Sequence, residues 1–357
     1  MRISAAASGA VKDLVQRLRI RRVLMQNMKL SGNSSRKFDL QRIVVFAVVI
    51  VLTAIFSIFS RDFRKFSTVV TLLDSFYYFC FISIGVTFCL ISGGNDLSVG
   101  TGMVCYALIG GYCITKLGLP AWAGMLVTIA CGLVFGVLNG FLVSVMNLPA
   151  FIATLCTMLI TRGLGSVVCG GAVNWPARSS PEGWFRNIFK LMVVNSSGKK
   201  TPVPVGVIPI ILAVIIMSII LNKTRVGRYI IAIGSNKEAA RLSGVNVVRY
   251  QMSAYIISGF FAGLAGIAYV CATNSSITPG SGAGLELDAI GGAIIGGTSM
   301  TGGVGSIFGT LLGILILTLL KNGLPKIGLG QDWQNIITGL VLIFAIYIDV
   351  LKNRKKA

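Results

Sequence analysis

Apolar stretches of bilayer length recur along the whole chain, and short polar or glycine-containing breaks separate them. About 20 apolar residues in helical form cross the hydrocarbon core of a membrane. The pattern therefore predicts an all-α integral membrane protein with ten transmembrane helices, some of them broken at glycines. The predicted spans cover residues 43–59, 69–91, 97–115, 119–145, 150–168, 204–221, 252–272, a short span from about 287, 307–320 and 333–351.

Composition supports a membrane protein over a soluble one. Of the 357 residues, 54% are hydrophobic and 12% are charged, and the mean hydropathy is +0.83. Soluble domains carry about 25% charged residues. Half that charge leaves too little polar surface to face water on all sides.

The net charge of +21 is concentrated in three segments. Ten Lys and Arg residues precede Ile43, six lie in residues 222–251, and four are in the last six residues. Basic segments beside apolar spans stay in the cytoplasm. Ten crossings place the tail 1–42, the connection 222–250 and the tail 352–357 on that one side, around a membrane domain of residues 43–351. Topology thus explains the charge, and we predict no nucleic-acid partner.

The N-terminal tail carries no sign of a cleavable signal peptide. The first apolar run begins only at Ile43, and no small-residue cleavage site follows it. The basic tail either lies along the anionic inner leaflet or has no fixed structure.

Catalytic and metal-binding chemistry is poorly represented. The chain has no histidine, which removes the commonest metal ligand and general base. Its eight cysteines form no CxxC pair and fit small buried hydrophobes. We therefore predict no enzyme activity, no metal site and no cofactor in this chain. A GxxxxGK[ST] nucleotide loop is also missing, so energy must come from a partner or an ion gradient.

Acidic residues interrupt two of the apolar regions. The run 93–98 contains two glycines and a carboxylate, and 286–288 contains two carboxylates. Such acids either cap short helices or mark a substrate path inside the membrane. The candidate path residues are Asn95, Asp96, Ser98, Asn139, Glu286 and Asp288.

The two acidic breaks occupy corresponding places. Each precedes a short glycine-rich span, then a span with glycines four residues apart, then an Asn-Gly pair. Glycines at this spacing predict close helix packing in lipid. One set starts from inside and the other from outside, which predicts an inverted repeat. The spaced glycines are Gly132, Gly136, Gly140, Gly305, Gly309 and Gly313.

The connection 222–250 contains the signals of one short helix. Ser235 or Asn236 can cap its start, Glu238 favours its first turn, and Gly244 ends it. Ala239 and Leu242 would form a small apolar face able to dock in a partner's groove. The alternative is a basic loop with a topological role only. The candidate contact residues are Ser235, Asn236, Glu238, Ala239, Ala240, Arg241, Leu242, Ser243 and Gly244.

Several of these stretches carry a family resemblance. They are SGGNDLSVG (92–100), PAFIATLCTMLITRG (149–163), TRVGRYIIAIGSNKEAARLSGVNV (224–247), LELDAIGGAIIGGTSMTGGVGSIFGT (285–310) and WQNIITGLVLIFAIYIDVLKNRKK (333–356). The chain resembles the permease subunit of bacterial ABC importers for monosaccharides, the family of the ribose, galactose, xylose and arabinose permeases. The resemblance covers roughly residue 66 to the C-terminus. Asn95 departs from it, because many members have an apolar residue there.

The resemblance implies partners and a location. Two permease subunits, expected to be a homodimer, would form a pathway in the bacterial inner membrane, with both termini cytoplasmic. ATPase subunits would bind below, at the coupling helix that 235–243 matches. A periplasmic or lipid-anchored binding protein would deliver the monosaccharide. The rival classes are a proton-coupled secondary transporter, with Asp96 or Asp288 carrying the proton, and a passive channel.

Overall fold

The computed structural model describes residues 43–194, 200–273 and 276–354. The predicted tail 1–42 and the last three residues lie outside the described residues. The chain divides into two units, Met1–Val44 and Val45–Ala357. The second unit contains almost all described residues, and the account below concerns that unit.

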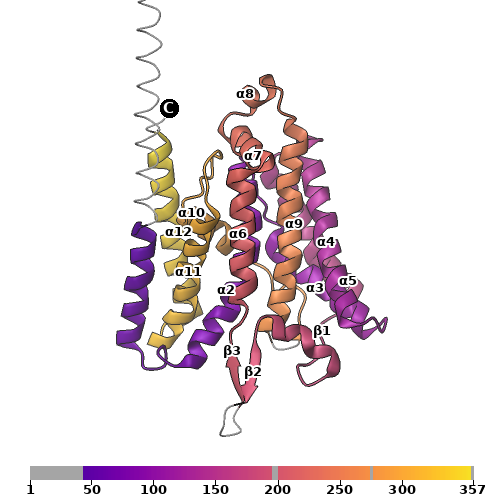
Figure 1. Cartoon of the computed structure of the whole chain (residues 1–357), viewed down its shortest axis with the longest axis vertical. Coiled ribbons are helices and arrows are strands. Elements are labelled where there is room, and N and C mark those ends of the chain that lie inside the picture. Colours follow the sequence, from indigo (N-terminus) through magenta and orange to yellow (C-terminus); the bar gives the residue numbers. More distant parts are fainter. Residues whose placement is uncertain (1–42, 195–199, 274–275, 355–357) are drawn as a thin grey trace, which may run out of the picture. The chain divides into compact units, whose positions relative to one another are not determined.

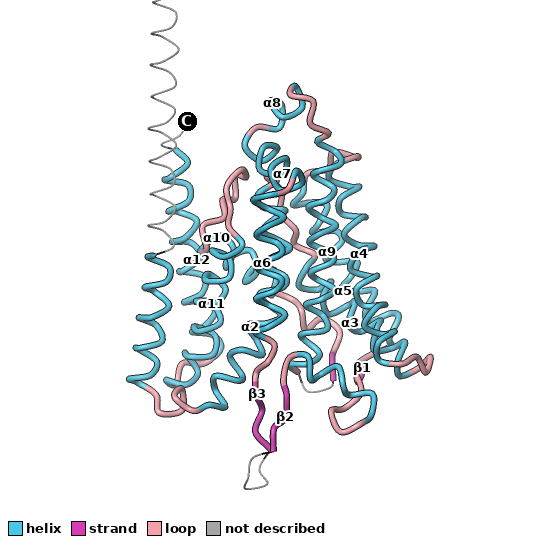
Figure 2. The backbone as a smooth tube through the Cα atoms, viewed as in Figure 1, coloured by secondary structure: helices cyan, strands magenta, loops and turns pink. Residues whose placement is uncertain are grey.

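The described residues are mostly helical (Figures 1 and 2). Local signals set several ends: Pro149 precedes one helix, and Gly170 ends that helix at a left-handed φ of 68°. The helices are Ile43–Phe59, α2 (Phe66–Ile91), α3 (Val99–Thr115), α4 (Ala121–Ser144), α5 (Ala150–Cys169), α6 (Val207–Lys223), α7 (Arg225–Ser235), α8 (Lys237–Leu242), α9 (Val247–Ala272), α10 (Leu285–Ile295), α11 (Ile307–Gly323) and α12 (Gln331–Arg354), with short 3-10 helices at η1 (Pro181–Ile188) and η2 (Leu324–Ile327).

Among the described residues, six helices are long and apolar enough to cross a membrane. The bent pair α6 and α7, with 66° between them, brings the number to as many as seven. The helix Ile43–Phe59 and α3 are shorter, and α10 has only 11 residues. At 1.5 Å per residue, α10 is about 16 Å long, against a core of about 30 Å. A helix stands at each of the ten predicted spans, but the count of ten crossings stays a prediction.

The expectation of an all-α chain was wrong at one end of the molecule, where the described residues form two short two-stranded sheets. The strands β2 (Leu191–Val194) and β3 (Lys200–Val203) pair antiparallel, and β1 (Val173–Asn174) pairs with β4 (Ser276–Ile277). A strand pair can form here because water satisfies the outer edge of each strand, which lipid cannot do. The β2–β3 hairpin projects from this end in Figure 1.

The core is built on α2 and α9, with α4 packed on α9. The predicted close approach of the spaced glycines is confirmed where α4 crosses α9. A Cβ placed on Gly259 would lie 2.1 Å from the carbonyl oxygen of Gly132, and one on Gly136 would lie 2.7 Å from that of Tyr255. The backbones therefore touch, and these helices gain van der Waals contact that larger residues would prevent.

The connection 222–250 has more structure than the predicted single helix. It contains α7, capped by the Thr224 hydroxyl, and then α8. The helix α12 continues to Arg354, although its apolar span ends at Leu351, where the tenth span was predicted to end.

Candidate functional site

The short helix predicted in the connection 222–250 is present as α8 (Lys237–Leu242). Its cap is Asn236, whose side-chain oxygen accepts a hydrogen bond from the Ala239 backbone N–H at 2.9 Å. Ser235, the other predicted cap, instead donates to the carbonyl of Ile231 within α7. Gly244 ends the helix with a φ of +81°, a conformation that suits glycine. Figure 1 shows α8 at the end of the molecule opposite the β2–β3 hairpin.

The predicted apolar face of Ala239 and Leu242 lies on the exposed side of α8, and its part in docking stays a prediction. Ala240 is the buried residue and packs with Ile233 and Val247 on its own chain. Ala239 is exposed, and Leu242 is 85% exposed. The six-residue helix turns Ala240 inward because one side must rest on α7 and α9. Leu242 is therefore the large apolar side chain that α8 exposes at the surface.

The other candidate contact residues surround Leu242 on the surface. Glu238 and Arg241 form an exposed ion pair at 2.8 Å, which adds little stability. Ser243 is exposed, and its hydroxyl donates to the carbonyl of Ala239. These residues are open to a partner, and their role in coupling stays a prediction.

Backbone contacts between glycines connect α7 to two loops. A Cβ on Gly234, in the last turn of α7, would lie 1.8 Å from the carbonyl oxygen of Ile91 at the end of α2. That carbonyl accepts a hydrogen bond from the Gly303 N–H at 2.9 Å, in the loop before α11. Gly302, with a φ of +88°, lies against both Gly93 and Gly234. We call Gly93, Gly234, Gly302 and Gly303 the glycine junction.

Three of the candidate path residues meet in one buried network. Asp96 is 1% exposed and accepts from the Ser98 backbone N–H at 3.0 Å and from its hydroxyl at 2.7 Å. Asn139 donates to the Ser98 hydroxyl at 2.8 Å. The first acidic break and the Asn-Gly pair of α4 are thus in direct contact, which the order of features along the sequence did not predict.

Two members of the network were missed from the sequence. The Ser258 hydroxyl donates to the second Asp96 oxygen at 2.7 Å, and Thr157 donates to the Asn139 side-chain oxygen at 2.7 Å. A signal existed for Thr157, because Thr154, Thr157 and Thr161 are spaced three and four apart in α5 and all are buried. Ser258 stands alone between apolar residues of α9 and gave no signal.

The second acidic break is held differently. Asp288 forms an ion pair with Lys321 of α11, whose ammonium group also lies 5.3 Å from the centre of the Phe79 ring. One Glu286 oxygen accepts from the Gly284 N–H at 3.0 Å, at the start of α10. Glu286 and Asp288 therefore do not meet the Asp96 network in the described contacts.

Asn95 is the most accessible of the candidate path residues. Its side chain is half-buried, and its carbonyl accepts from the Tyr255 hydroxyl at 3.3 Å. Asp96, Ser98, Asn139, Glu286 and Asp288 are all buried. The N-cap residues of α3 and α10, Ser98 and Gly284, make no side-chain cap hydrogen bond, so the contacts of the acids are not those of simple helix caps. The part of the acids in a substrate path stays a prediction.

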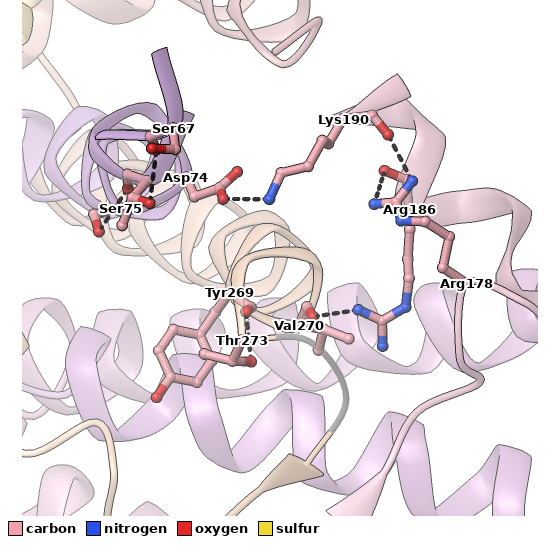
Figure 3. Close-up of polar contacts among 10 residues, drawn as sticks. Ser67, Asp74, Ser75, Arg178, Arg186, Lys190, Tyr269, Val270 and Thr273 are labelled. Atoms are coloured by element: carbon pink, nitrogen blue, oxygen red, sulfur yellow. Dashed lines mark hydrogen bonds and ion pairs between the residues drawn. The ribbon is translucent and has the colours of Figure 1, made fainter. Parts of the chain in front are cut away.

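Polar contacts attach the segment between β1 and α6 to the helices α2 and α9 (Figure 3). Lys190 forms an ion pair with Asp74 of α2, and Arg178 donates to the Lys190 carbonyl at 2.6 Å. Arg186 is buried in η1 and donates to the Val270 carbonyl at 2.9 Å, near the end of α9. Burial lowers the pKa of Arg186 from its usual value, but an arginine starts so high that it stays charged.

The fold and these contacts define a class of protein. Apolar helices surround acids that are already committed to structural contacts, while α8 exposes an apolar side chain at one end. A multi-helix membrane protein of this kind fits the permease component of a transport system. The chain belongs to the family described as branched-chain amino acid transport system / permease component, whose profile matches residues 68–346. A permease component of this family is not itself an enzyme and carries no cofactor.

Curated relatives match nearly the whole chain. The ribose import permease protein of Haemophilus influenzae is 33% identical, over 91% of this chain and 99% of its own. That of Escherichia coli K12 is 36% identical, over 86% and 92%. The galactose/methyl galactoside import permease protein of Haemophilus influenzae is 32% identical, over 90% and 98%. No solved structure matches the chain.

Proposed function

We propose that this chain is the permease subunit of an ABC importer that carries a monosaccharide of the ribose or galactose class across the bacterial inner membrane. The observation that carries the proposal is the match to sugar import permeases along nearly the full length of both chains. The family membership and the many apolar helices are consistent with it.

The energy would come from a separate ATPase that binds at α8. The sequence lacks a GxxxxGK[ST] loop, and α8 is a capped helix with an exposed leucine. When the ATPase pair closes on ATP, it would push α8. The glycine junction then offers a direct path to the end of α2 and to the loop before α11, because Gly234 touches both.

The proposed topology has ten crossings with both termini in the cytoplasm. In Figure 1, α8 and the end of α12 share one end of the membrane unit, whereas the β2–β3 hairpin lies at the other. This arrangement supports a cytoplasmic C-terminus beside α8, in agreement with the basic residues of both segments. The short helices α3 and α10 would each complete a crossing together with the non-helical backbone beside them, as the broken helices of transporters do.

The proposed assembly contains a second permease subunit, the ATPase pair and a sugar-binding protein. The inverted repeat is part of the proposal, since each acidic break is followed by a short helix, α3 or α10, and then by a glycine-spaced helix. A neutral sugar needs a wet path with weak sites, because a tight site would hold it. The candidate path residues would face that path only in another conformation.

The proton-coupled alternative has less support. Asp96 accepts from two hydroxyls and one backbone N–H, and Asp288 is ion-paired with Lys321. A proton carrier must exchange protons with water on each side in turn, and both carboxylates are enclosed by these contacts.

Uptake by proteoliposomes tests the proposal. The permease is reconstituted with its ATPase and binding protein, and labelled ribose or galactose is followed with ATP supplied to the ATPase side. We expect accumulation that requires ATP and survives a protonophore. Loss of uptake on adding the protonophore, with ATP held constant, would show that a proton gradient drives the transport.

A further inference from the structure

A cavity of about 390 Å³ opens beside the first half of α2, at the end that carries the hairpin. Six of its lining residues come from α2, and besides Val70 they carry polar groups: Ser67, Thr71, Asp74, Ser75 and Tyr78. They are spaced by three or four residues around Asp74 and Ser75, so they form one polar stripe along an otherwise apolar helix. Polar residues inside a membrane helix mark a functional path by default.

The opposite wall comes from three other segments. Lys190 reaches in from the connection between η1 and β2, Pro202 belongs to β3, and Ala272 and Thr273 lie at the end of α9. In Figure 3 the Lys190 ammonium group points at the Asp74 carboxylate, and Thr273 lies below them next to Tyr269. The cavity is therefore lined by four parts of the chain that meet at this end.

The groups in this cavity suit a neutral ligand with many hydroxyls. The hydroxyls of Thr71, Ser75 and Thr273 donate to backbone carbonyls of their own helices at 3.0, 3.3 and 2.8 Å. Their oxygen lone pairs remain available to accept from a ligand. Asp74 and Lys190 neutralise each other, so an ion would have to break their pair. A sugar hydroxyl can instead donate to the carboxylate while another accepts from the ammonium group.

The size of the cavity fits a small ligand. Its volume is at the lower end of the range of about 300 to 1,000 Å³ for small-molecule sites. The hydroxyls are on the surface of the helices, and both Thr71 and Thr273 are exposed. A site of this kind binds weakly, which suits a step on a transport path.

We propose that this cavity is an outer sugar subsite, where the permease receives the monosaccharide before it enters the membrane. The proposal rests on the proposed function, because it assumes that the carried ligand is a sugar. It assigns Asp74, Lys190 and the three hydroxyls of Thr71, Ser75 and Thr273 to ligand contact.

Saturation-transfer NMR on the permease–ATPase complex in lipid nanodiscs, without binding protein or nucleotide, tests the subsite. D-ribose and D-galactose are titrated separately, since weak binding is what the method detects. We expect the wild type to transfer saturation to one of them. The double variant T71V/S75A should weaken that binding about tenfold, because it removes two hydrogen-bond acceptors. T273V, which changes the opposite wall, should weaken it several-fold.

The matched control is Thr115→Val. Thr115 also donates to a carbonyl of its own helix, at 2.9 Å, and lies outside the cavity lining, so T115V should bind as the wild type does. Equal titrations for the wild type, T71V/S75A and T273V would overturn the subsite, as would the absence of saturation transfer from either sugar. ATP-driven uptake by the wild-type complex is measured separately, so failure of the subsite leaves the proposed function standing.

Discussion

At the scale of single residues, the buried aspartates Asp96 and Asp288 each have groups that compensate their charge. Asp96 has three hydrogen-bond donors from Ser98 and Ser258. Asp288 has the ammonium group of Lys321. Burying an isolated carboxylate costs many kcal/mol, so these partners are a condition for the fold.

Asp96→Ala should destabilise the protein by about 2–4 kcal/mol, because it leaves the buried Ser98 and Ser258 donors without their acceptor. Reversible unfolding of the purified protein by SDS in mixed micelles measures the difference. Asn95→Ala is the matched control and should change stability by less than about 0.5 kcal/mol, since the Asn95 side chain is half-buried. Equal stability of D96A and the wild type would contradict the structural role given to this carboxylate.

At this scale the sequence picked out polar residues but not their contacts. Ser98 and Asn139 were chosen from their positions at breaks and in the Asn-Gly pair, and the structure shows that they are in contact. Lys321 was not linked to Asp288, because the two are 33 positions apart and pairing across helices depends on helix rotation. Ala239 and Leu242 are exposed, as a face for a partner must be, but the burial of Ala240 was not predicted, since a helix this short fits several rotations.

At the scale of elements, the glycine junction makes α7, α2 and the loop before α11 act together. Their backbones touch at Gly234, Ile91 and Gly303. Gly234, Gly302 and Gly303 have no side chains that would keep these backbones apart. We therefore expect a movement of α8 to pass through α7 to the end of α2 and to the loop before α11.

Gly234→Ala should impair both stability and transport. Its Cβ would lie 1.8 Å from the Ile91 oxygen, and such overpacking costs about 1–3 kcal/mol. The matched control is Gly163→Ala in α5, where a Cβ meets nothing within 4 Å among the described residues. G163A should be neutral or stabilising by up to about 1 kcal/mol. SDS unfolding and ATP-driven uptake of both variants are the measurements; wild-type behaviour of G234A would refute the junction.

The elements themselves followed from hydrophobic pattern to different degrees. Long apolar runs became α2, α4, α5, α9 and α12 with small errors at the ends. The helix α7 was missed because the 222–250 connection was judged by its positive charge, and α7 has apolar residues on one face only. The strands β2 and β3 were missed because four-residue strands leave little periodicity.

At the scale of the whole molecule, the charge pattern and the positions of α8 and α12 point to the same orientation. This orientation puts the turn at Gly118 outside the cell and the turn at Gly244 inside. Both glycines have positive φ, 68° for Gly118 and 81° for Gly244. A Cβ built on either glycine would meet no other atom within 4 Å among the described residues.

Epitope tags inserted after Gly118 and after Gly244 should report the orientation, because both turns have room for an insertion. In intact spheroplasts an antibody should bind the first tag and not the second, and after permeabilisation it should bind both. Labelling of the Gly244 tag in intact cells would reverse the topology. ATP-driven uptake by each tagged protein serves as the check that it is folded.

The central claim is that a separate ATPase drives this permease through α8, and Leu242→Asp tests it most directly. Leu242 is exposed, so the substitution should leave folding intact, as judged by SDS unfolding, whereas Ala240→Glu would disturb α8 itself because Ala240 is buried. Leu242→Met, which stays apolar, is the matched control. The measurement is ATP-driven sugar uptake by the reconstituted complex. The account predicts a loss of at least tenfold for L242D and near-normal uptake for L242M; full uptake by folded L242D would contradict it.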